Sequence, residues 1–120
     1  MTTTDYEKSI VALACWRFMG SETYRGMLMA AMVLRNRAEQ GWFDGSIYRN
    51  ASVEVSDKYL PKYPDPRDPE FQKLLQAMDG IFSGSIEDKT GGALYWTLLS
   101  NEEIIAGERT AQFGKYIFFK

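Results

Sequence analysis

The sequence has 120 residues, contains no histidine and has a single cysteine. Without histidine, a serine or cysteine nucleophile has no imidazole base to activate it, and a hydrolytic zinc site lacks the ligand that such sites almost always use. The composition therefore excludes triad hydrolases and zinc hydrolases. If the protein is an enzyme, the remaining mechanism is acid-base or nucleophilic catalysis by carboxylates, assisted by Tyr, Lys, Ser, Thr and backbone dipoles. No metal and no cofactor is expected.

An excess of positive charge is also missing. The chain has 14 Lys and Arg against 16 Asp and Glu, which gives a formal net charge of -2 and a pI near 5.2. This charge provides no positive field for a phosphate backbone, so we expect no nucleic-acid partner. Arg35 and Arg37 are interpreted as part of a solvated helix edge.

Long apolar runs and targeting signals are absent as well. No segment is an uninterrupted apolar span of bilayer length, so we expect no membrane span. The beginning, MTTTDYEKS, has neither a basic n-region nor an apolar h-region. This predicts synthesis in the cytoplasm without a signal peptide. Cys15 has apolar neighbours in VALACWRF, and we interpret it as a buried structural thiol.

What is present is the composition of a globular protein, with 45% hydrophobic, 14% aromatic and 25% charged residues. The length suits one hydrophobic core, which predicts a single domain over residues 1–120. Thr4 and Glu7 have the spacing of a capping box. They predict a first helix that runs to about Met19.

Capping residues, apolar runs and terminating glycines predict two further helices. Ser21 is expected to cap a helix whose run MLMAAMVL, residues 27–34, is apolar on every side and therefore surrounded by protein. Gly41 ends it. Asp68 as cap and Pro69 at the first helical position predict a later helix that ends at Gly84.

The remaining segments are less periodic. Residues 42–66 concentrate Pro, Asp and Tyr and are expected to form a long ordered loop with one short helix near Ser46 to Asn50. The tail has two aromatic-rich extended segments, GGALYWTLL and AQFGKYIFF, expected to form a small hairpin-like patch. The predicted fold class is mainly α, or α+β with a minor β-hairpin element.

Three stretches, in this order, resemble the SleB-type cell wall hydrolase family, to which spore-cortex-lytic enzymes and phage cell wall hydrolases belong. They are ETYRGMLMAAMVLRNRA, then DPEFQKLLQAMDGIFSG with DKTGGALYW, and finally ERTAQFGKYIFF. Each stretch alone is weakly specific, but together they cover nearly the whole chain except residues 42–66. The resemblance implies a lysozyme-like fold that acts on peptidoglycan glycan strands as a lytic transglycosylase or muramidase.

Glycosidic cleavage needs a protonated carboxyl near the bridging oxygen, and a lytic transglycosylase can work with one. The resemblance gives this role to Glu22. The family usually has a Glu-x-x-x-Glu pair here, and without gaps its first position is Phe18. Either Glu22 takes the catalytic role or the acid is lost. A carboxylate after Ser21 also has a purely structural explanation, because it stabilises the helix dipole.

The expected substrate-binding residues are Tyr24, Gly91, Gly92, Tyr95 and Trp96, because sugars present flat apolar faces that stack on exposed rings. The glycines and rings would otherwise form only a turn and core packing. Acidic loop residues, namely Asp44, Glu54 and Asp57, are interpreted as solvated charges, one of which could orient water.

Two other functions stay open at this point. The chain is either the enzyme, an inactive glycan-binding module, or a virion structural protein on the same fold. The expected partners are peptidoglycan strands and other virion proteins. The expected site of action is the cell wall, in phage lysis or on the virion.

Overall fold

The computed structural model describes residues 3–19, 24–55, 64–100 and 107–120. Over these ranges the chain forms four α-helices followed by a three-stranded antiparallel sheet, which confirms the predicted mainly helical class. The helices are α1 (Asp5–Met19), α2 (Tyr24–Glu39), α3 (Ile47–Val55) and α4 (Pro69–Ser83), with a short 3-10 helix, η1 (Trp42–Gly45). The strands are β1 (Tyr95–Leu98), β2 (Arg109–Phe113) and β3 (Tyr116–Phe119).

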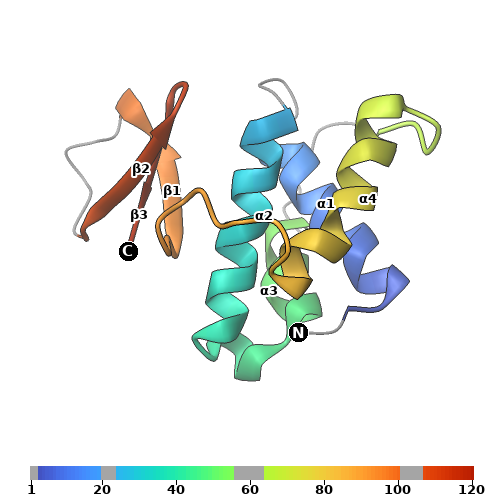
Figure 1. Cartoon of the computed structure of the whole chain (residues 1–120), viewed down its shortest axis with the longest axis horizontal. Helices are drawn as coiled ribbons and strands as arrows, with labels where there is room; N and C mark the ends of the chain where they lie inside the picture. Colours follow the sequence, from blue (N-terminus) through green and yellow to red (C-terminus); the bar gives the residue numbers. More distant parts are fainter. Residues whose placement is uncertain (1–2, 20–23, 56–63, 101–106) are drawn as a thin grey trace.

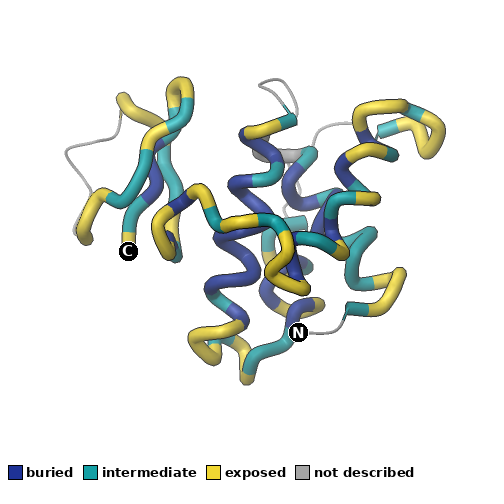
Figure 2. The backbone as a smooth tube through the Cα atoms, viewed as in Figure 1, coloured by how far each residue is buried: buried dark blue, intermediate teal, exposed yellow. Residues whose placement is uncertain are grey.

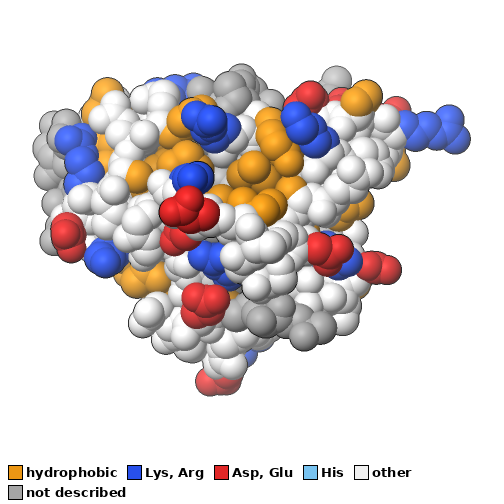
Figure 3. Space-filling model, viewed as in Figure 1, with side chains coloured by type: hydrophobic (Ala, Val, Ile, Leu, Met, Phe, Trp, Pro, Cys, Tyr) orange, Lys and Arg blue, Asp and Glu red, His pale blue; other side chains and the backbone are white. Residues whose placement is uncertain are grey.

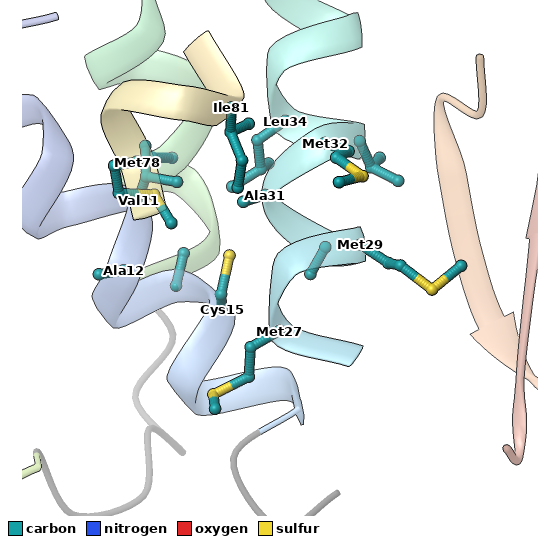
Figure 4. Packing of buried hydrophobic residues seen from close by; sticks show 14 of the residues in the cluster. Val11, Ala12, Cys15, Met27, Met29, Ala31, Met32, Leu34, Met78 and Ile81 are labelled. Carbon is teal, nitrogen blue, oxygen red and sulfur yellow. The ribbon is translucent and has the colours of Figure 1, made fainter. Parts of the chain in front are cut away.

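Helix α2 lies at the centre of the molecule. Figure 1 shows the other helices on one side of it and the sheet on the other side. Residues 27–34 are buried except Leu28, which is half-buried, so the predicted buried helix is confirmed (Figure 2). Figure 4 shows side chains of α1, α2 and α4 meeting in a core rich in methionine. Burial in this core raises the pKa of the Cys15 thiol, as expected of a structural cysteine.

The helix ends follow the sequence closely. Glu7 N donates to Thr4 Oγ1 at 3.2 Å while Thr4 N donates to Glu7 Oε1 at 3.0 Å, which confirms the capping box. Asp68 caps α4 through a hydrogen bond from Glu70 N at 2.9 Å, and α4 ends at Gly84 with a φ of 85°. Ser21, the expected cap of the second helix, lies outside the described residues.

The segment expected to be an ordered loop with one short helix near Ser46 to Asn50 does contain that helix, although the helix is longer than predicted and residues 56–63 lie outside the described residues. It contains η1 and the nine-residue α3, which begins after Ser46. Arg49 N donates to Ser46 Oγ at 3.0 Å, as at a helix N-cap. Helix α3 buries only Ile47, Asn50 and Ala51. Because a single large aliphatic side chain marks its buried face, the sequence shows little periodicity.

The sheet also differs from the predicted pairing. Its order is β1-β3-β2, so β3 is the central strand. The segment AQFGKYIFF forms a hairpin by itself, with Gly114 at a φ of 56° between β2 and β3. A glycine with positive φ suits the two-residue turns that match the twist of hairpins. Phe118 is fully buried and joins the sheet to the helical core.

Candidate functional site

At the C-terminal end of α2, aromatic rings from other elements surround the guanidinium group of Arg37. We define the Arg37 cluster as Arg37, Trp42, Glu54, Tyr95 and Trp96. Arg37 Cζ lies 4.8 Å from the ring centroid of Trp42, 5.1 Å from that of Trp96 and 5.8 Å from that of Tyr95. Its Nη1 donates to Glu54 Oε1 at 2.9 Å. The Arg37 side chain is only 11% exposed, so its interpretation as a solvated edge was wrong.

Tyr95 is the ring of this cluster that faces solvent most. It is 40% exposed, stacks on Phe119 with centroids 5.2 Å apart and meets Trp42 edge-on at 5.4 Å. Trp96 is half-buried and packs against the hydrophobic core. Of the two predicted sugar-binding rings in this cluster, Tyr95 therefore presents the larger exposed face, while Trp96 also contributes to packing.

The two predicted glycines lie in the loop that precedes β1. Both are exposed, with φ of 70° at Gly91 and 81° at Gly92, a region that other residues rarely adopt. A Cβ at Gly91 would lie 3.1 Å from Thr110 Cβ and 3.2 Å from its carbonyl oxygen. Turn geometry and the approach to β2 thus account for glycine here, and a role in binding stays a prediction.

A polar network fixes this loop against α2. Asn36 Nδ2 donates to Asp88 Oδ2 at 3.1 Å and to the Ala93 carbonyl at 3.0 Å. The backbone N and Oγ1 of Thr90 donate to Asp88 Oδ1 at 2.7 and 2.6 Å, and Gly92 N donates to Asp88 Oδ2 at 3.1 Å. Burial alone would raise the pKa of Asp88, but these hydrogen bonds outweigh it and hold the pKa below its usual value.

Arg35 belongs to the same region and is buried. Its Nη1 donates to the Ile81 carbonyl at 2.9 Å, and its Nη2 lies 3.7 Å from Asp88 Oδ2. The prediction of a solvated Arg35 was therefore wrong as well. The sequence contained a hint, since a helix that is apolar on every side leaves little surface for a charged residue directly after it.

The acidic residues of the loop region have different environments. Glu54 is bound to Arg37 and is not a solvated charge. Asp44 is exposed and has a φ of 58° in η1. Asp57 lies outside the described residues.

A pocket of about 370 Å³ lies between the first half of α2 and β2. Its lining residues are Arg25, Met29, Lys89, Gln112 and Phe113, and we call it the Arg25 pocket. Figure 4 shows Met29 pointing from α2 toward the strands. In Figure 3, apolar side chains (orange) over α2 are bordered by Lys and Arg (blue). The sequence did not predict this pocket, because its residues come from three distant segments.

The predicted acid, Glu22, lies outside the described residues. It precedes Tyr24, the first residue of α2, by two positions and Arg25 by three. Among the described residues, none that lines the Arg25 pocket is a carboxylate. Phe18 is in the last turn of α1, and its side chain is not described.

Tyr24 is not brought together with the other predicted binding residues. Lys73 of α4 places its Nζ 4.1 Å from the Tyr24 ring centroid. Burial, followed by the charge of Glu70, raises the pKa of Tyr24. Positions 24 and 37 are about 20 Å apart along α2 at 1.5 Å per residue. Tyr24 thus faces α4 near one end of α2, whereas Tyr95 lies in the Arg37 cluster at the other end.

Comparisons of the chain with protein-family models, curated proteins and solved structures find no match. The resemblance to the SleB-type family therefore rests on the three quoted stretches alone. Within the described ranges, no group of three or more His, Cys, Asp or Glu could hold a metal ion. No helix in the same ranges is both long and apolar enough to cross a membrane.

Proposed function

We propose that the chain cleaves peptidoglycan glycan strands, as a lytic transglycosylase or muramidase, with Glu22 as general acid and base. One observation carries the proposal. The Arg25 pocket opens beside the first turns of α2, directly after Glu22 in the chain, and the small sheet forms its opposite wall. This arrangement supplies a concave surface at the end of α2 that follows the candidate acid in the sequence.

The pocket favours transglycosylation over hydrolysis. Hydrolysis by an inverting enzyme requires a second carboxylate to activate water, and a retaining enzyme uses a second carboxylate as nucleophile. No described residue that lines the pocket supplies one. In a lytic transglycosylase, a hydroxyl of the substrate replaces water, so Glu22 alone would suffice.

The Arg37 cluster supports a binding role further along the same helix. Tyr95 offers an exposed ring that suits the apolar face of a sugar. An extended glycan strand that lies along α2 would contact both the Arg25 pocket and Tyr95. The substrate-binding residues in this proposal are Gly91, Gly92, Tyr95 and Trp96, and Tyr24 is less suited because it faces α4.

Glu22→Gln tests the proposal. Gln keeps the shape of the side chain but cannot protonate the departing sugar oxygen, so lysis of a peptidoglycan suspension should fall by at least about a hundredfold. Glu70→Gln is a matched control, because Glu70 is an acidic residue in the first turn of α4. Mass spectra of the digest identify the reaction, since anhydro ends indicate transglycosylation and reducing ends indicate hydrolysis.

Equal lysis by the parent and by Glu22→Gln would refute the catalytic assignment. The alternative is an inactive glycan-binding or virion structural protein, and the presence of Phe18 at the position of the family's first glutamate favours it. Sedimentation with insoluble cell wall separates these two roles, because only a glycan-binding protein would pellet with the wall.

A further inference from the structure

The Arg25 pocket has a chemical character that a neutral sugar chain does not require. Two cationic side chains, one amide and two apolar side chains line it, and no described lining residue is acidic. The chain as a whole has a formal charge of -2. The pocket is therefore a local positive site on a slightly acidic protein, and an anionic ligand would match it.

Both cations are available to a ligand. Among the described residues, Arg25 makes no ion pair, and its side chain is exposed. Lys89 Nζ pairs with Glu87 at 2.8 Å, but the two side chains are 61% and 81% exposed. Such a surface pair contributes little to stability, so a ligand carboxylate could replace Glu87 at low cost.

The fold fixes the backbone that carries these two side chains. Lys89 N donates to Met32 Sδ at 3.3 Å, and its neighbour Asp88 is held by Thr90. This fixes the backbone that carries Lys89 against α2. Arg25 is in the first turn of α2, so the two cations approach the pocket from different elements.

We propose that the Arg25 pocket binds a carboxylate of the peptide stem that peptidoglycan strands carry. A guanidinium matches the two oxygens of a carboxylate, and Lys89 adds a second positive charge. Met29 and Phe113 suit the aliphatic side chains of a short peptide better than a fully hydrated phosphate. The inference rests on the proposed function, because the stem branches from the same glycan strand that Glu22 would cleave.

The test compares two soluble glycan fragments of the same length, one with peptide stems and one from which an amidase has removed them. Binding is measured by calorimetry in the Glu22→Gln background, so that the fragments stay intact. Stem-bearing fragments should bind at least about tenfold more tightly, the scale of hydrogen bonds to a charged group. Arg25→Gln and Lys89→Gln should each remove most of this difference in affinity between the two fragments.

Arg67→Gln is the charge-matched control, because Arg67 is exposed and does not line the pocket. It should leave both affinities unchanged. Thermal melts of each variant show that it is folded, and Arg25 and Lys89 provide two independent tests.

The outcomes distinguish the two proposals. Equal affinity for both fragments overturns the stem assignment and leaves the proposed function intact. Binding of neither fragment, together with no lysis by the parent, overturns both. If glycerol phosphate polymer displaces the fragments and removal of the stem has no effect, the pocket selects phosphate and the assignment to the stem is wrong.

Discussion

Tyr95 and Trp96 are neighbours in the chain, but we expect them to differ in their contributions to stability and to wall binding. Tyr95→Ala removes an exposed ring and its contact with Phe119, which should cost about 1 kcal/mol of stability. Trp96→Ala empties part of the core and should cost about 3 kcal/mol. Sedimentation with insoluble peptidoglycan and urea unfolding measure the two effects. We expect Tyr95→Ala to weaken wall binding at nearly parental stability, and a large stability loss with unchanged binding would assign Tyr95 to the core.

Gly91 should tolerate a side chain less well than another glycine of similar conformation. In Gly91→Ala the new residue must adopt a positive φ, and its Cβ is also crowded by Thr110. In Gly84→Ala the residue must adopt a φ of 85°, but nothing lies within 4 Å of its Cβ. The left-handed conformation costs about 1–2 kcal/mol at either position. Denaturant unfolding should show an additional loss at Gly91 of about 1 kcal/mol, the lower end of the cost of overpacking. Equal losses would mean that the loop moves away from β2 without cost.

At the scale of elements, Asp88 is the residue that ties the loop before β1 to α2. Asp88→Asn should lower the stability at neutral pH by about 1–3 kcal/mol, because an amide cannot accept all of the hydrogen bonds from Thr90, Asn36 and Gly92. Thermal melts at pH 7 measure this loss. Asp44→Asn is the control, because Asp44 is exposed and Asn tolerates its left-handed conformation.

The same variant should change the acid dependence of stability. Because folding lowers the pKa of Asp88, its carboxylate stabilises the protein above the ordinary Asp value near 3.9. This contribution is lost as the pH falls through the lower, folded pKa. Asp88→Asn should therefore have a flatter stability profile below about pH 4 than the parent. Parallel profiles for both proteins would contradict the role of the hydrogen bonds.

Elements defined by nearby residues could be predicted from the sequence, and those defined by distant contacts could not. The capping box at Thr4, the cap at Asp68 and the buried run 27–34 are local patterns, and all are confirmed. Helix α3 was predicted only as a short helix near Ser46 to Asn50, because its buried face is small, and it continues to Val55 in the structure. The Arg37 cluster and the Arg25 pocket each combine segments far apart in sequence, so no spacing rule could find them.

At the scale of the whole molecule, the predicted single domain has a direct test. The hydrophobic core runs from α1 to Phe118 of β3 without interruption. We therefore expect one cooperative unfolding transition. Trp16 contacts Phe71 of α4 edge-on at 5.7 Å and reports on the helices, whereas Trp96 reports on the sheet.

Two variants make the measurement selective. One retains only Trp16 and the other only Trp96, with Phe at the remaining tryptophan positions. In each variant the fluorescence midpoint in urea should coincide with the midpoint from far-UV circular dichroism. If the sheet unfolds at a lower urea concentration than the helices, the chain consists of two folding units and the prediction of a single domain is wrong.

The burial of Cys15 has a consequence for how the molecule can be studied. Its side chain has no solvent exposure, and the chain has no other thiol. A thiol-specific alkylating reagent in solution therefore reaches Cys15 Sγ only in molecules whose core has opened. The rate of alkylation reports how often that opening occurs, without any engineered label. Intermolecular disulfides, for the same reason, would form only between molecules that have already opened.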